Sequence, residues 1–171
     1  SMKAFIISFT FLLLTIFGYH YSKQIPQESK EQLEYGGVLW PKSSRYEMSN
    51  AGDISISLAE DFSAFQGHWS IGTLFKFDGD KLAEIQTLEG FQFAELEFKH
   101  KTKIVLEDFP PFILHVFHLE EEMQVDGLDL KPGCKIQFKD YVLYAAQCED
   151  FGVVYFKRSV DLPENAKIKN E

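Results

Sequence analysis

The chain has little cysteine, little basic charge and no catalytic motif, and each shortage excludes a class of protein. Two Cys in 171 residues are too few for a disulfide-stapled miniprotein or a four-cysteine zinc site. Only 17 Lys and Arg stand against 26 Asp and Glu, a formal net charge of -9, which does not suit a nucleic-acid partner. No Gly-x-Ser-x-Gly elbow, Gly-rich phosphate loop or recognisable pair of catalytic acids occurs, so the sequence predicts neither an enzyme nor a cofactor.

Apolar and aromatic residues, by contrast, are abundant. The hydrophobic fraction is 45%, and 17 residues are Phe. That is enough to bury a core, which excludes a chain that is disordered as a whole. The length fits one domain, or one small domain with appendages.

Residues 1–21 are predicted to direct the chain to a membrane. No residue from Ala4 to Tyr19 is charged, and the run follows Lys3. Its length is near the lower limit of about 17 residues for a spanning helix. Three interpretations compete: an uncleaved signal anchor, a cleaved signal peptide, and a buried segment of the fold. Bulky rings near Gly18 make a poor cleavage site, which favours the anchor and membrane attachment through residues 4–21. Anchor and signal peptide both place the rest of the chain outside the cytoplasm, in the periplasm or at the cell surface.

The remaining chain is predicted to contain three parts. Residues 22–50 are polar and form a stalk or linker, residues 51–161 form a β domain, and residues 162–171 form a polar tail. We expect no internal repeat.

Period-two alternation of apolar and polar residues determines the expected fold. It is clear in Asp53–Leu58 and in Phe91–Phe98, and turn residues separate such segments. Seven or eight short strands predict an all-β, mainly antiparallel domain. The expected architecture is a small OB-like barrel or a β-sandwich, preceded by an N-terminal hydrophobic helix. The apolar positions should share one interior, including those of Phe91, Phe93 and Phe138.

Between residues 103 and 157, several features follow one another in a characteristic order. A strand over Lys103–Glu107 leads to Phe109-Pro110, then to an apolar strand over Phe112–Leu119, then to a turn and strand over Gly127–Phe138. This order resembles that of small periplasmic copper- and silver-binding domains. The resemblance implies an OB-type barrel.

The metal ligands of that family are not matched. Phe112 and Leu114 stand where the resemblance places two Met, and the position at which it places a His falls near Glu107. Cu(I) prefers thiolate, thioether and imidazole ligands. We therefore expect no tight binding of Cu(I) or Ag(I), and no bound metal.

Cys134 and Cys148 have two open interpretations. In an oxidising compartment they would form a disulfide, worth about 3 kcal/mol by loop closure. If the hairpin turns at Lys139-Asp140, however, they fall on opposite faces, and a bridge then needs a β-bulge. The alternative is two buried free thiols that pack as small apolar groups.

Other polar residues are interpreted conservatively. His115 and His118 should point to opposite faces of a strand, which disfavours a two-histidine metal site. The acidic run Glu120–Glu122 is interpreted as a solvated loop, because it lacks EF-hand spacing.

The candidate interaction surface combines His68 and Trp69 with Phe112, Leu114 and His115. Motif positions that have become apolar suit packing against another protein. The predicted function is a non-enzymatic, membrane-anchored periplasmic β domain that binds protein partners and acts in the assembly of a cell-envelope complex. The alternative is a β-barrel protein that binds a small ligand or a metal.

Overall fold

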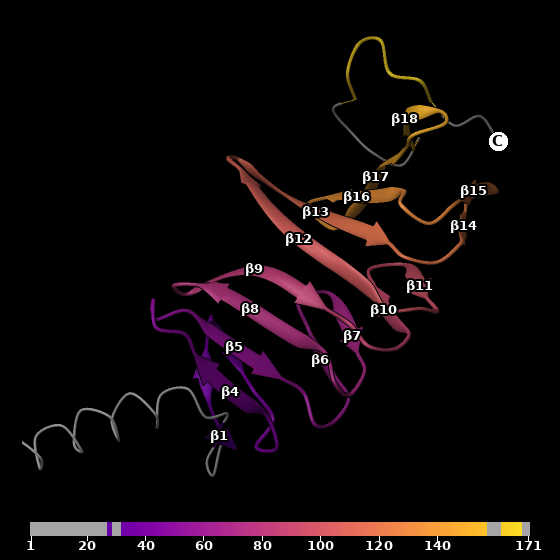
Figure 1. The fold of residues 1–171 in the computed structure, drawn as a ribbon. Coiled ribbons are helices and arrows are strands. Elements are labelled where there is room, and N and C mark those ends of the chain that lie inside the picture. Colours follow the sequence, from indigo (N-terminus) through magenta and orange to yellow (C-terminus); the bar gives the residue numbers. More distant parts are fainter. Residues whose placement is uncertain (1–26, 29–31, 157–161, 169–171) are drawn as a thin grey trace, which may run out of the picture.

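A computed structural model describes residues 27–28, 32–156 and 162–168 of the chain. The described part is all-β, with antiparallel sheets and no helix, as predicted (Figure 1). It accordingly has no helix that is long and apolar enough to cross a membrane. The expected signal anchor and hydrophobic helix, residues 1–21, lie outside the described residues.

Ten strands form one large sheet in chain order, and each strand pairs with the next in antiparallel orientation. The sheet is therefore built from successive hairpins. Its strands are β1 (Gln27–Glu28), β4 (Arg45–Met48), β5 (Ile54–Ser57), β8 (Leu74–Asp78), β9 (Lys81–Gln86), β12 (Thr102–Phe109), β13 (Phe112–Leu119), β16 (Lys135–Lys139), β17 (Val142–Cys148) and β18 (Gly152–Tyr155).

Short hairpins form a second layer against one face of this sheet. Four of their strands join into one sheet in the order β11-β10-β7-β6, whereas β2–β3 and β14–β15 remain separate hairpins. The strands are β2 (Glu34–Tyr35), β3 (Val38–Leu39), β6 (Phe62–Ala64), β7 (Gly67–Trp69), β10 (Phe91–Phe93), β11 (Leu96–Phe98), β14 (Met123–Val125) and β15 (Leu128–Leu130). The face of the large sheet that they cover is the inner face, and the opposite one is the outer face.

The two layers arise from a structural repeat of four strands, a short hairpin followed by a long one. The four sets are β2–β5, β6–β9, β10–β13 and β14–β17. At or just after the end of the second short strand, each set carries a fully or almost fully buried apolar residue: Trp40, Trp69, Phe98 and Leu130. These residues are 29, 29 and 32 positions apart. The expectation of no internal repeat is therefore wrong. The four sets share their order of strands and the position of a buried residue, and they share residue types to a lesser extent.

The hydrophobic core lies between the large sheet and the short hairpins. The ring of Phe93 lies 5.0 Å from that of Phe138 and 4.9 Å from that of Phe117, measured between centroids. Phe91 stacks on Phe98 at 4.7 Å. The prediction that Phe91, Phe93 and Phe138 share one interior is confirmed. Each buried ring contributes about 1.5–3 kcal/mol of transfer free energy.

The large sheet does not close into the expected OB-like barrel. Among the described residues, β1 pairs only with β4 at one end of the sheet, and β18 pairs with β17 at the other. An open sheet results because each new hairpin adds to the previous one and no strand returns to the first. A single parallel bridge between Tyr155 and Ile168 extends the β18 end.

The β fold also begins before residue 51. Trp40 is fully buried, its ring centroid lies 4.9 Å from that of Phe75, and its Nε1 donates to the carbonyl oxygen of Tyr35. Residues 32–50, expected in a polar linker, thus belong to the first repeat. Part of the expected polar tail is ordered as well, since Tyr155 N donates to the carbonyl oxygen of Lys167 at 2.8 Å.

Candidate interaction surfaces

Of the first two residues of the predicted interaction surface, one is exposed and the other lies in the core. His68 is exposed on β7, with its Nδ1 2.7 Å from Ser63 Oγ. The adjacent Trp69 is fully buried, and its Nε1 donates to the carbonyl oxygen of Ala64 at 2.8 Å. Neighbouring residues of a strand point to opposite faces, so an exposed His68 places Trp69 in the core.

The second half is divided in the same way along β13. His115 lies on the inner face, whereas Phe112 and Leu114 lie on the outer face. Leu114 is buried by its neighbours and Phe112 is half-buried. The five predicted residues therefore do not form one surface, because alternation along each strand separates them.

His115 is a histidine buried among aromatic rings. Its side chain is 1% exposed, and its ring centroid lies 5.2 Å from that of Phe93 and 5.0 Å from that of Tyr141. Nδ1 has no hydrogen-bond partner among the described residues. Burial lowers the pKa of His115 to about 4, although the nearby Asp140 carboxylate acts in the opposite direction. His115 is therefore neutral at pH 7 and packs as part of the aromatic core.

The two cysteines form a disulfide across the β16–β17 hairpin. The Cα atoms of Cys134 and Cys148 are 4.5 Å apart. The hairpin turns at Asp140-Tyr141, one residue later than considered above, and the register shifts between Gln137 and Phe138. This bulge brings both cysteines to the same face, which the regular register would not do. In the preceding repeat, the equivalent cross-strand pair is Thr102 and Leu119.

An apolar surface lies at the end of the longest hairpin. Strands β12 and β13 have eight residues each, and their connecting turn projects beyond the neighbouring strands (Figure 1). Large apolar residues here and in the adjacent β16–β17 turn have 38% to 48% of their surface exposed. We call these residues the apolar tip: Phe109, Pro110, Pro111, Ile113, Tyr141 and Val142. They gather at two adjacent turns and occupy both faces of the sheet there, with Phe109 on the outer face and Ile113 on the inner face.

Several contacts hold the apolar tip in one arrangement. Ile113 N donates to Asp140 Oδ1 at 3.3 Å, and Asp140 N donates to the carbonyl oxygen of Ile113 at 3.2 Å. These bonds join the two turns. The Phe109 and Phe112 rings are 5.9 Å apart, and Lys139 Nζ lies 4.3 Å above the Phe112 ring. These contacts hold the apolar tip in a fixed position against the β16–β17 turn.

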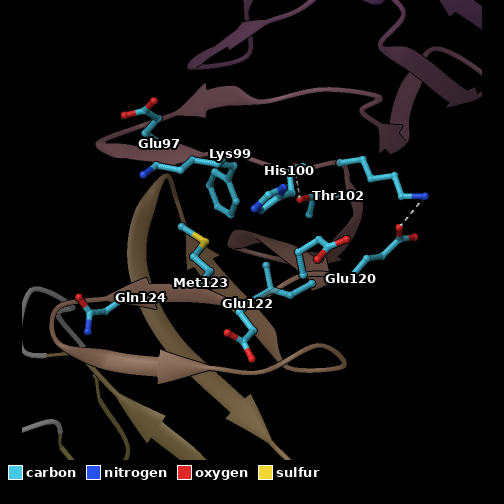
Figure 2. A pocket seen from close by; sticks show the side chains of 12 residues that line it. Glu97, Lys99, His100, Thr102, Glu120, Glu122, Met123 and Gln124 are labelled. Atoms are coloured by element: carbon cyan, nitrogen blue, oxygen red, sulfur yellow. Dashed lines mark hydrogen bonds and ion pairs between the residues drawn. The ribbon is translucent and has the colours of Figure 1, made fainter.

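A groove of about 370 Å³ lies where the second layer is interrupted, between β11 and β14. We call it the β11–β14 groove. Phe98, Leu119 and Met123 supply apolar lining. Figure 2 shows Met123 and His100 turned toward the cavity from opposite walls.

Charged residues surround this groove, but few of them are paired. Lys101 Nζ lies 3.2 Å from a carboxylate oxygen of Glu120, which links the two walls. Among the described residues, no ion pair involves Glu97 or Lys99. Figure 2 shows Glu97 turned away from the cavity, at the outer surface of the second layer. The loop Glu120–Glu122, interpreted above as solvated, forms part of one wall.

No group of three or more His, Cys, Asp or Glu in the described part of the chain could hold a metal ion. Glu107 pairs in register with Leu114, and Phe112 pairs with Phe109. A carboxylate and an aliphatic side chain are poor ligands for Cu(I), and the disulfide leaves no free thiolate.

Comparison with known proteins gives no relative: no family model, curated protein or solved structure matches the chain.

Sequence reasoning found neither the apolar tip nor the groove. A signal for the tip is present in Phe109-Pro110-Pro111-Phe112, where two aromatic residues flank prolines that cannot continue a strand. For the groove no local signal exists, because it depends on two hairpins from successive repeats failing to pair.

Proposed function

We propose that this chain is a non-enzymatic, membrane-anchored extracytoplasmic domain that binds a protein partner within an assembly of the cell envelope. The observation that carries the proposal is the apolar tip. Single exposed apolar residues are common on proteins, but several large ones gathered at two adjacent turns indicate an interaction site. Aromatic residues in particular are enriched in protein interfaces.

The rigidity of the tip supports binding. Prolines fix the backbone of the turn, and the Ile113–Asp140 hydrogen bonds fix its position against the next hairpin. A surface held in its binding conformation loses less entropy on association. Phe109 is 48% exposed, so its full burial by a partner would contribute about 1 kcal/mol.

Charge favours a protein over an anionic lipid surface as the partner. Glu107, Asp108 and Asp140 surround the tip, and the Lys81 ammonium is paired with Asp108 at 3.3 Å. The whole chain has a formal net charge of -9. Both features oppose attraction to anionic headgroups.

The Cys134–Cys148 disulfide supports an extracytoplasmic location, because disulfides persist mainly in oxidising compartments. The anchor is proposed from the uncharged run within residues 4–21.

A pull-down tests the proposal. Tagged full-length protein is retrieved from detergent-solubilised membranes of the cells that produce it, as wild type and as Phe109→Ser/Ile113→Ser. Leu88→Ser is the matched control, because Leu88 is 67% exposed at the opposite end of the long hairpins. We expect one protein to be retrieved equally by wild type and control, and about tenfold less by the tip variant. Equal retrieval by all three would contradict the proposal.

A further inference from the structure

In the second layer, a strand of the second repeat pairs with a strand of the third, whereas the third and fourth repeats do not pair with each other. β7 pairs with β10 through His68↔Gln92 and Gly67↔Phe93, which joins the second and third repeats. The equivalent strands of the third and fourth repeats are β11 and β14, and they are not paired. The β11–β14 groove occupies this interruption.

Both walls of the groove therefore include a strand with a free side. Within the described residues, β11 pairs with β10 alone and β14 pairs with β15 alone. An edge strand offers backbone N–H and C=O groups to another extended chain, which is the basis of binding by strand addition. The groove beside β11 is open and partly apolar, so it can accommodate side chains of an added strand.

The charges at the end of β11 define which strand would fit. Glu97 lies in β11, and Lys99 is the first residue after the strand ends at Phe98. Both side chains are exposed, and continued strand alternation past Phe98 puts them on the same face. A strand antiparallel to β11 would place one residue opposite Lys99 and, two positions later, another opposite Glu97. Complementary charges at these positions are acidic first and basic second. The residue between them would face the apolar lining made by Phe98, Leu119 and Met123.

We propose that the β11–β14 groove binds an extended peptide segment of a protein partner, in antiparallel pairing with β11, through an acidic–aliphatic–basic sequence read from the N-terminus to the C-terminus. This proposal rests on the protein-binding function proposed above but uses a different surface from the apolar tip.

Two peptides of identical composition test the proposal. Fluorescein-labelled Val-Glu-Val-Lys-Val has the proposed order, and Val-Lys-Val-Glu-Val has the reverse order. Each is titrated with full-length protein in detergent micelles, and fluorescence anisotropy reports binding. We expect the first peptide to bind about five-fold more tightly. The double variant Glu97→Lys/Lys99→Glu should reverse the preference, and N-methylation of the backbone amides of the first peptide should weaken its binding.

Three results would overturn the proposal. Equal affinities for the two peptides would do so, and so would a preference that the charge-swapped variant leaves unchanged. A wild-type chain that dimerises and binds neither peptide would assign the free side of β11 to a second copy instead.

The tip variant separates this inference from the proposed function. Phe109→Ser/Ile113→Ser should bind the first peptide with unchanged affinity. If peptide discrimination fails while the pull-down succeeds, only the groove proposal is lost. If the pull-down shows no dependence on the tip while peptide discrimination holds, the role of the apolar tip is lost and the groove remains the binding site.

Discussion

Acidification should destabilise this protein through His115 in particular. The pKa of His115 is about 4 in the folded chain, against about 6.5 when unfolded. Between these values the unfolded state binds more protons, so the free energy of unfolding falls as the pH falls from about 6.5 towards 4. At pH 4.5 the loss amounts to about 2.5 kcal/mol relative to pH 7.5. It arises because a charged imidazole would be buried among Phe93 and Tyr141 with no partner at Nδ1.

Urea unfolding of the full-length chain at pH 7.5 and pH 4.5 measures this loss. Carboxylates also titrate in this range, so the informative quantity is the difference between wild type and His115→Leu. The variant should lose about 2–3 kcal/mol less than wild type between the two pH values. His118→Gln, at the half-buried histidine on the outer face, should keep most of the wild-type loss. Identical losses in wild type and His115→Leu would show that the fold does not hold His115 neutral.

Three further predictions concern the disulfide, the core and metal binding. Cys134→Thr/Cys148→Leu copies the Thr102–Leu119 pair of the preceding repeat, and urea melts should show a loss of about 3 kcal/mol from the missing cross-link; unchanged stability would mean that the cross-link contributes nothing. Phe93→Ala should cost about 3–5 kcal/mol in the same assay, and a loss below about 1 kcal/mol would contradict its core position. Equilibrium dialysis of the reduced full-length protein should show no stoichiometric, sub-micromolar binding of Cu(I), whereas tight binding that His115→Leu abolishes would restore the metal-binding alternative.

The sequence predicts which residues of a single strand face the core, but it does not predict how the strands assemble. Phe91 and Phe93 were assigned to the core because they occupy the apolar phase of a regular strand. The repeat has no simple sequence signature, because the equivalent residues Trp40, Trp69, Phe98 and Leu130 are of three types and the last interval is longer than the first two. Burial between two layers requires a large apolar side chain at that position and does not require a particular one.

Two local features also exceeded what the sequence could specify. Most residues of the segment before residue 51 are polar, which predicts a linker, yet the buried Trp40 and the pairing of β4 with β5 fix it to the fold. The disulfide required a bulge, and a one-residue change of register reverses the face of every later side chain. Such a shift depends on packing of the whole hairpin and leaves no local pattern.

The candidate surfaces depend on how hairpins end and meet. Phe109-Pro110-Pro111-Phe112 predicts the end of one strand and the start of another, which is correct for the backbone but does not predict exposure of the side chains. Exposure of the tip follows from the extra length of β12 and β13 relative to β16 and β17. The groove follows from an absent pairing between two hairpins, which only the three-dimensional arrangement reveals.

Site-specific photocrosslinking shows whether the apolar tip contacts a protein partner. p-Benzoylphenylalanine replaces Phe109 in one full-length variant and Leu88 in another, and both are irradiated in intact membranes of the cells that produce the protein. We expect a discrete protein adduct of defined mass from position 109, none from position 88, and loss of the adduct when Ile113→Ser is added. Adducts of equal yield from both positions, or lipid adducts alone from position 109, would contradict this expectation.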